Sequence, residues 1–358
     1  MGKIDFLNNL ASKKFRYDLG AGVPPLHLYP EIDINELLSV FSKSSSINKF
    51  QYHSTSGIIS EIVEEYFTHA EKVTVPKSQL FVTNGVQEAI AIMNQIFKNS
   101  GAMYIDPYYP GFTENAMMTG LKITSMNSSS MVESLKNTPT GSLVYLIPDF
   151  SNPTGYSLTL NEREEVLRIA EERDFYIFED ATYRPFYIED QLPTLLSINE
   201  RRVIHAFSFS KIFAPSLRVA FVSVPDSLKK KFSEVKSNIS INSSGISQSI
   251  VDGWLLKNYY NFDIHLNKIR ELLKINHEIV DKFSTPLKKP GGFFRFLDVP
   301  NQNCDFEYCE TLMNDFDIAV CPMFLFSNNT KNQNKLRISL ANISPSNLME
   351  ALTIIKNE

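Results

Sequence analysis

Short apolar runs alternate with longer amphipathic runs through the middle of the sequence, and this alternation constrains the fold more than any other feature. The run "QLFVTNG" (79–85) precedes the helix-like "VQEAIAIMNQIFKN" (86–99), and "SLVYLIPDF" (142–150) precedes "LTLNEREEVLRIAEERD" (158–174). Apolar runs that alternate with helical patterns in this way are typical of parallel strands covered by helices. We therefore predict an α/β fold with a mainly parallel sheet and helices on its faces, including a helix over 160–173.

The pattern changes after about residue 246. A long helical stretch (255–283) leads through the turn "KKPGG" (288–292) into the strand-like "FFRFLDV" (293–299), and a second strand-like run, "KLRISLA" (335–341), precedes a final helix. This order predicts a smaller α+β domain. We expect an N-terminal segment (1–40) that contributes to the small domain and the substrate site, a large domain (41–250) and a small C-terminal domain (251–358).

Composition excludes several classes of protein. The 358 residues carry a net charge of −5, which provides no basic field for nucleic acid. No run approaches the roughly 18 apolar residues of a membrane span, and the first 20 residues lack a secretory signal pattern, so we predict a cytoplasmic protein. The cysteines Cys304, Cys309 and Cys321 form no metal-ligand pattern and are expected to be plain thiols, so no metal is predicted.

Five polar residues stand at or just beyond the ends of predicted strands: Asn152, Asp180, Tyr183, Lys211 and Arg218. Each has an ordinary explanation by itself. Asn152 fits a turn, Asp180 fits a helix N-cap and Lys211 fits a loop. Together they are no longer independent, because the carboxyl ends of parallel strands meet at one crevice.

A pyridine ring that carries a phosphate and an aldehyde would explain this set. Asp180 would pair with a protonated ring nitrogen, Tyr183 and Asn152 would hydrogen-bond the ring oxygen, and Lys211 would form a Schiff base. Lys211 must then spend time as a neutral amine, which burial and a neighbouring cation favour. Arg218 would supply that cation while it pairs with the phosphate.

The motifs "NPTG" (152–155), "EDATY" (179–183) and "SFSK" (208–211) with "PSLR" (215–218) resemble the pyridoxal phosphate enzymes of fold type I, in the class I and II aminotransferase family. The resemblance runs from about residue 17 to 340 and is similar to the aminoadipate, kynurenine and broad-specificity branch. It implies a seven-stranded sheet, pyridoxal 5'-phosphate as cofactor, and an amino acid and a 2-oxo acid as substrates.

The resemblance also implies further cofactor contacts. Backbone N–H groups of Gly85, Val86 and Gln87 would face the phosphate at a helix N-terminus, where a plain helix start is the alternative. Ser208 and Ser210 would join Arg218 in a phosphate clamp. Tyr109 in "DPYYPGF" would lie on the pyridine ring, although it could instead only pack its loop. Tyr52 in "FQYHSTSG" would reach the phosphate of a partner subunit, which implies a homodimer with shared active sites.

The substrate contacts follow from the same resemblance. Arg337 would hold the substrate α-carboxylate, unless it is only a surface strand residue, and Asn152, Gly22 and Val23 would complete the contacts. A fixed carboxylate favours removal of the Cα proton, which Lys211 would carry. A lining of Phe112, Tyr183, Phe324 and Phe326 would favour an apolar or aromatic amino donor.

Three functions follow from this reading. The first is an aminotransferase that moves an amino group from an L-amino acid to a 2-oxo acid through a Lys211 Schiff base. The second is another pyridoxal phosphate reaction, such as elimination, cyclisation or decarboxylation, because the same residues serve its early steps. The third is a ligand sensor like the effector domain of some bacterial regulators. About 16 residues precede "YDLGAGVPP", which we consider too few for a DNA-binding domain.

Overall fold

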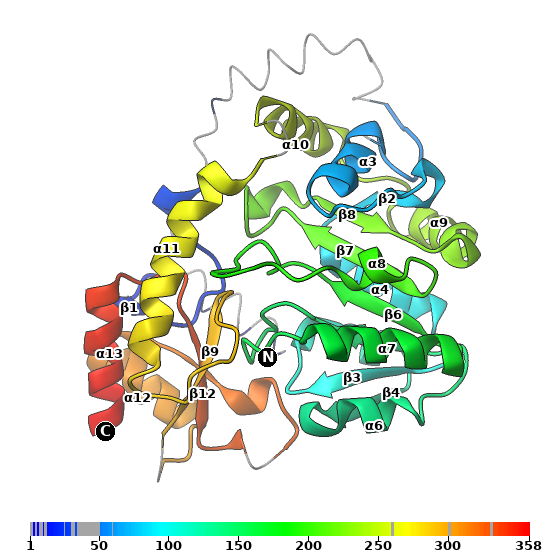
Figure 1. The fold of residues 1–358 in the computed structure, drawn as a ribbon. Coiled ribbons are helices and arrows are strands. Elements are labelled where there is room, and N and C mark those ends of the chain that lie inside the picture. The colour runs from blue at the N-terminus through cyan, green and yellow to red at the C-terminus, as the bar shows by residue number, and fades with distance from the viewer. Residues whose placement is uncertain are drawn as a thin grey trace.

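The computed structural model describes the chain in two parts that lie side by side (Figure 1). One part is built on a large sheet, and the other contains the C-terminal helices together with the N-terminal strand at Tyr17–Asp18. The described residues are 3, 6, 10, 13–24, 26–29, 33, 51–58, 60–258, 261–299, 302–329 and 332–358.

The large sheet has seven strands in the order β2-β8-β7-β6-β5-β3-β4. Only β8 runs antiparallel to its neighbours, so the predicted mainly parallel seven-stranded sheet is confirmed. The strands are β2 (Leu80–Thr83), β3 (Ala102–Asp106), β4 (Ile123–Asn127), β5 (Leu143–Leu146), β6 (Tyr176–Asp180), β7 (Val203–Ser208) and β8 (Ala220–Ser223).

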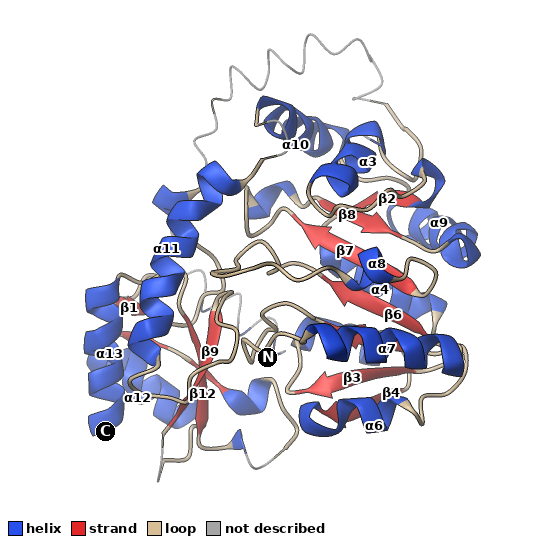
Figure 2. Cartoon of the chain, in the orientation of Figure 1, coloured by secondary structure: helices blue, strands red, loops and turns tan. Residues whose placement is uncertain are grey.

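Helices cover both faces of this sheet (Figure 2), which is why its central strands are buried along nearly their whole length. The predicted helix over 160–173 is confirmed as α7, which begins with a capping box between Thr159 and Glu162. The helices of this part are α3 (Ser60–His69), α4 (Val86–Ile96), α5 (Pro110–Thr119), α6 (Met131–Leu135), α7 (Leu160–Arg173), α8 (Leu195–Ile198), α9 (Asp226–Ser240) and α10 (Gly245–Lys257).

The smaller part has a three-stranded antiparallel sheet in the order β11-β12-β9. The N-terminal segment joins it, because β1 (Tyr17–Asp18) pairs in parallel with β10 (Ile318–Ala319). The remaining elements are β9 (Phe294–Asp298), β11 (Cys321–Pro322), β12 (Lys335–Ser339), α11 (Asp263–Val280), α12 (Phe306–Phe316) and α13 (Pro345–Asn357). This α+β arrangement is the predicted one.

One expectation for this region is wrong. The helical stretch over 255–283 is not continuous, since α10 ends at Lys257 and α11 begins at Asp263. Asn261 lies just before the new start, and its side chain accepts a hydrogen bond from the Asp263 N–H at 2.9 Å. The proposed boundary between 250 and 251 falls inside α10, and the boundary between 40 and 41 lies outside the described residues.

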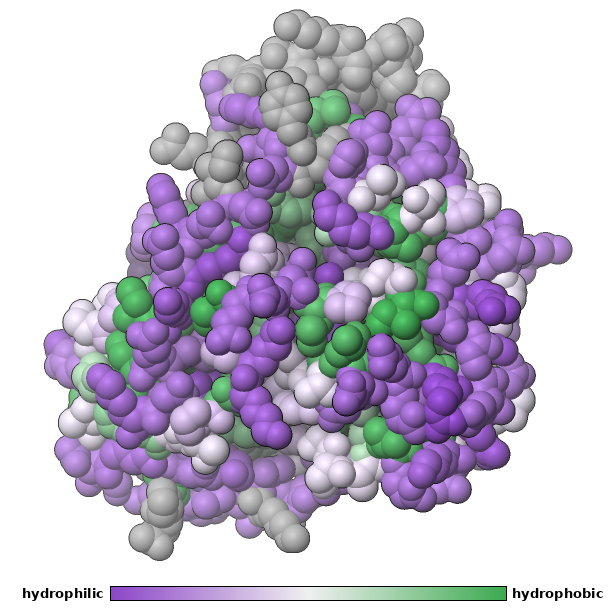
Figure 3. Space-filling model, in the orientation of Figure 1, coloured by the Kyte–Doolittle hydropathy of each residue, from purple (hydrophilic) through white to green (hydrophobic). Residues whose placement is uncertain are grey.

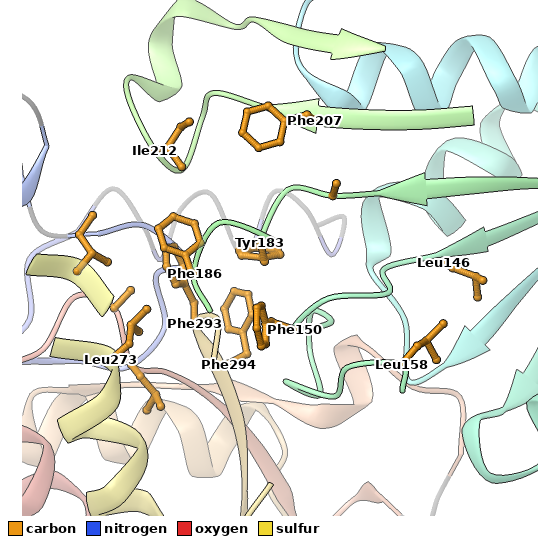
Figure 4. Close-up of a cluster of buried hydrophobic side chains, with 14 of the residues drawn as sticks. Leu146, Phe150, Leu158, Tyr183, Phe186, Phe207, Ile212, Leu273, Phe293 and Phe294 are labelled. Carbon is orange, nitrogen blue, oxygen red and sulfur yellow. The ribbon is translucent and has the colours of Figure 1, made fainter. Parts of the chain in front are cut away.

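Aromatic side chains join the two parts. Figure 4 shows Phe150, Tyr183, Phe186, Phe293 and Phe294 gathered in one buried cluster. The face in Figure 3 is mostly hydrophilic, with small scattered hydrophobic patches. In the described part of the chain, no helix is both long and apolar enough to span a membrane. The three cysteines are buried and free, as expected.

Candidate active site

A pocket of about 240 Å³ opens at the carboxyl ends of the parallel strands, bordered by the N-terminal segment and by β9 and β12. It brings together nearly all the site residues predicted from the sequence. These are Gly22, Val23, Val86, Gln87, Tyr109, Asn152, Asp180, Tyr183, Ser208, Ser210, Lys211, Arg218 and Arg337.

Lys211 lies in the turn that follows β7, and its side chain is half-buried in this pocket. Burial lowers the pKa of its ammonium to about 8, with help from the positive charges of Arg218 and Arg337, while Asp180 opposes the shift. At pH 7 roughly one molecule in ten then carries a neutral amine at this position. A neutral lysine amine is a nucleophile and a proton acceptor.

Asp180 ends β6 and is buried at 4% exposure. Burial raises the pKa of its carboxyl group, although hydrogen bonds from Thr182 and Tyr145 oppose the shift. The Tyr145 hydroxyl donates to Asp180 Oδ2 at 2.7 Å, and the Thr182 hydroxyl donates to Oδ1 at 2.6 Å. Among the described residues no cation forms an ion pair with Asp180, so a cation bound in the pocket would be stabilised here.

Donors for an anion converge at the N-terminus of α4. Gly85, with φ of +77°, precedes this helix without a side-chain cap. Arg218 points at it so closely that a Cβ on Gly85 would lie 2.3 Å from an Arg218 guanidinium nitrogen. Arg218 itself has φ of 54° and donates to Ser210 Oγ at 3.2 Å. A helix N-terminus beside a guanidinium and serine hydroxyls is suited to a phosphate.

Arg337 in β12 is buried at 3% exposure, and its guanidinium lies between the rings of Phe294 and Phe326 at 4.5 and 4.6 Å. It donates to the Gly20 carbonyl at 2.5 Å and to Asn152 Oδ1 at 3.4 Å. Its Nε is buried and has no partner among the described residues. A buried guanidinium with a free donor can bind a carboxylate.

Two aromatic hydroxyls complete the pocket wall. Tyr183 lines the pocket together with Asn152, and burial raises the pKa of its hydroxyl. Tyr109, which precedes α5, donates to Gln87 Oε1 at 3.3 Å, and burial raises the pKa of its hydroxyl to about 12. Both tyrosines are therefore neutral hydrogen-bonding groups at physiological pH.

Two predicted contacts lie outside this pocket. Gly85 does not line it, and its N–H already donates to the Thr83 carbonyl at 2.8 Å. Tyr52 has 81% of its surface exposed, and its predicted contact with the phosphate of a partner subunit stays a prediction. The aromatic lining was mostly wrong: Phe112 stacks on Tyr145, and Phe324 packs on Phe306. Phe326 lies behind Arg337, so only Tyr183 of that set lines the pocket.

The sequence reasoning missed three residues: Tyr145, Thr182 and Phe294. Tyr145 was detectable in principle. It lies opposite Phe178 on the neighbouring strand, and Phe178 shares a face of the sheet with Asp180, two residues further along β6. That places Tyr145 on the same side as Asp180. Phe294 contacts both Tyr183, with ring centroids 5.2 Å apart, and Arg337. No motif pointed to Phe294.

The pocket fits pyridoxal phosphate on three observations. The lack of a side chain at Gly85 lets the Arg218 guanidinium reach the N-terminus of α4, and the buried carboxylate of Asp180 forms no ion pair among the described residues. The amine of Lys211 has a pKa lowered into the range of a nucleophile. The donor set therefore suits a phosphate, a protonated ring nitrogen and an aldehyde.

Comparison with known proteins identifies the family of the chain. The family model for aminotransferase class I and II matches residues 11–355. The chain is 27% identical to (S)-3,5-dihydroxyphenylglycine transaminase of Amycolatopsis orientalis, over 85% of this chain and 76% of that protein. It is 24% identical to the HTH-type transcriptional regulator NorG of Staphylococcus aureus, over 98% of this chain and 82% of that protein.

Solved structures show the same fold. The α-aminoadipate aminotransferase LysN of Thermus thermophilus superposes with a TM-score of 0.83 at 22% identity and covers 100% of this chain and 94% of its own. The fold and the pocket define a pyridoxal phosphate enzyme of fold type I. The chain belongs to the class I and II aminotransferase family and is a pyridoxal phosphate-dependent aminotransferase.

Proposed function

We propose that Lys211 is the residue that binds the cofactor and carries the proton in transfer of an amino group from an L-amino acid to a 2-oxo acid. The observation that supports this most is a lysine with a pKa lowered to about 8, placed in one pocket with Asp180 and Arg337. Pyridoxal phosphate supplies the aldehyde that takes up the amino group and a ring that accepts the electron pair of the Cα–H bond.

The other pocket residues hold and tune the cofactor in this proposal. Asp180 pairs with the protonated ring nitrogen, and the hydrogen bond from Tyr145 keeps its carboxylate charged. Asn152 and Tyr183 hydrogen-bond the ring oxygen. Tyr109 lies against the ring face. The phosphate is held by Ser208, Ser210, Arg218 and the backbone N–H groups of Val86 and Gln87.

Arg337 orients the substrate. Its unpartnered Nε, together with Asn152, binds the α-carboxylate, while Gly22 and Val23 close the pocket over it. Because the carboxylate is held, the Cα hydrogen is directed to Lys211 Nζ. Lys211 would remove this proton from the substrate and donate it to the cofactor. Loss of the carboxylate itself is disfavoured by the same contacts.

The amino donor in this proposal has an apolar or aromatic side chain. Apart from Lys211, Arg218 and Arg337, no cation lines the described pocket to bind a second carboxylate. Ile147 and Phe294 give part of its wall an apolar surface. A relative is named for (S)-3,5-dihydroxyphenylglycine, an aromatic amino acid.

We also propose a cytoplasmic homodimer in which Tyr52 contacts the phosphate bound by the partner subunit. The support is the exposure of Tyr52, which is 81% accessible in a single chain although tyrosines usually bury most of their ring. A domain division near residues 40 and 250 is part of the same proposal.

A half-reaction tests this function. Each of the twenty amino acids is added in turn to the purified holoenzyme, and the absorbance of the bound cofactor is followed. We expect loss of the visible band with an aromatic or apolar amino acid and its return with a 2-oxo acid. Release of amine or ammonia without an acceptor would indicate another cofactor reaction, and binding without turnover would indicate a sensor.

A further inference from the structure

Four buried charged side chains lie behind the pocket and form one ion network: Glu71, Asp149, Arg163 and Arg184. Arg163 donates to Asp149 Oδ1 at 2.6 Å, and Arg184 contacts Asp149 Oδ2 at 3.4 Å. Arg184 also donates to Glu71 Oε2 at 2.8 Å. None of the four side chains is more than 6% exposed, and two positive charges balance two negative ones.

The network ties together backbone segments that are distant in the sequence. Arg163 in α7 donates to the carbonyls of Pro148 and Leu158, which are the two ends of the loop that carries Asn152. It also donates to the Pro193 carbonyl at 2.8 Å, and Arg184 donates to the Leu192 carbonyl at 2.6 Å. The loop at 148–158 is therefore fixed to the segment at 181–194.

These are the two segments that place Asn152 and Tyr183 in the pocket. Asp149 precedes Asn152 by three residues, and Arg184 directly follows Tyr183. The Asp149–Arg184 contact therefore joins the two segments on the buried side, while Asn152 and Tyr183 line the pocket on the other side.

The backbone of the loop at 148–158 is strained, so its conformation depends on contacts such as those of the ion network. Phe150, between Asp149 and Ser151, has φ of 52°, in the left-handed region that a bulky residue rarely adopts. Its N–H donates to Ser157 Oγ at 2.9 Å. Its ring fills the space beside Gly291 and Gly292, and Figure 4 shows it next to Phe294 and below Tyr183.

Stability alone does not account for the network. Taking four charges out of water costs so much that apolar side chains of similar volume often stabilise a core equally well or better. Charged networks of this kind instead impose geometry, because each oxygen and each N–H accepts only a few directions. The geometry imposed here is that of the loop before Asn152.

We propose that Asp149, held by Arg163 and Arg184, is a positioning residue that sets the place of Asn152 relative to Tyr183 and thereby their action on the ring oxygen of the cofactor. This inference rests on the proposed function of Asn152 and Tyr183.

The test uses holoenzyme with Asp149→Asn. Donors to the ring oxygen stabilise the form in which that oxygen is negatively charged, so a misplaced donor raises the pH at which the visible absorbance titrates. We expect the midpoint to rise by about 0.4 to 1 pH unit, the equivalent of one ordinary hydrogen bond. The matched control is Glu165→Gln, which breaks an exposed ion pair with Arg168 in α7, the helix that also carries Arg163. This variant should leave the midpoint unchanged.

A double-mutant cycle separates positioning from a general effect. In an Asn152→Ala background, Asp149→Asn should produce little further shift, because its effect passes through Asn152. An equal shift in both backgrounds would overturn the proposal, as would a lower melting temperature with an unchanged midpoint.

A second variant guards against misfolding of Asp149→Asn. Arg163→Lys keeps a positive charge beside Asp149 but loses the forked donation to the two loop ends. It should raise the midpoint in the same direction, and an unchanged midpoint in a folded protein would contradict the proposal. If the unmutated protein has no visible band that titrates, the proposed function itself fails, which is a distinct result.

Discussion

The hydroxyl of Tyr145 donates a 2.7 Å hydrogen bond to Asp180 Oδ2 where both side chains are buried. Tyr145 lies in β5 and Asp180 ends β6, so two neighbouring parallel strands join at this contact. Because burial raises the pKa of Asp180, donors to its carboxylate decide how much of it stays charged.

Tyr145→Phe removes one of these donors. We expect the pKa of Asp180 to rise further, since a hydrogen bond to the charged form favours that form. A hydrogen bond to a charged group contributes about 1.5 to 3 kcal/mol, so kcat should fall by roughly 10-fold or more while the cofactor remains bound. Tyr176→Phe loses a hydroxyl contact with Ser227 outside the pocket and should keep its kcat.

Gly85→Ala tests the anion site. Its new Cβ would lie 2.3 Å from Arg218 and displace the guanidinium, so the cofactor should bind at least about 10-fold more weakly. Gly141→Ala is a close control, because Gly141 also has a positive φ, of 73°, but nothing lies within 4 Å of its Cβ position. Both variants carry backbone strain, and Gly85→Ala carries about 1 to 3 kcal/mol because its φ of 77° and ψ of 169° lie in a region that essentially only glycine adopts.

Equilibrium titration of pyridoxal phosphate into each cofactor-free variant gives the affinities. Equal affinity for Gly85→Ala and Gly141→Ala would show that the approach of Arg218 to Gly85 does not serve the phosphate.

Arg337→Ala tests the carboxylate site. The lost charge-assisted hydrogen bonds are each worth about 1.5 to 3 kcal/mol, so KM for the amino acid should rise roughly 100-fold. The absorbance of the bound cofactor should stay unchanged. Lys335→Ala, two residues earlier in the same strand, breaks only a partly exposed pair with Asp298 and should leave KM unaltered. Loss of cofactor in Arg337→Ala would mean that its role was misassigned.

Lys211 should react with amine reagents at unusually low pH in the cofactor-free protein. Burial and the cations Arg218 and Arg337 favour its neutral form, so its labelling rate should rise with a midpoint near pH 8. Arg218→Gln removes a cation that lowers this pKa, so the midpoint should move to higher pH. The exposed Lys122 in the same digest provides an internal reference. If the midpoint of Lys211 labelling is the same in Arg218→Gln as in the unmutated protein, the electrostatic account is contradicted.

The strand-end residues could be predicted because the sequence carries local signals for them. Lys211 and Asp180 each follow an apolar run that reads as a strand, and parallel strands end at one edge. The Asp149–Arg184 pair could not be predicted, since its members are 35 residues apart and each resembles an ordinary loop charge. Their meeting depends on how two loops pack after the sheet has formed.

The break between α10 and α11 was missed for a different reason. The helical pattern continues across 255–283 in the sequence, whereas in the structure α10 ends at Lys257 and α11 begins at Asp263. The misplaced aromatic lining has a similar cause. Phe112 and Phe326 are apolar residues near the site in the sequence, but the sequence does not distinguish a pocket wall from the core behind it.

Borohydride reduction of the holoenzyme followed by peptide mapping tests the central claim most directly. Reduction fixes the cofactor to the amine that holds it, so the mass of the modified peptide identifies the lysine. We predict a single labelled peptide that contains Lys211, and no label in a Lys211→Ala variant. A label on another lysine, or no label on the unmutated protein, would contradict the account.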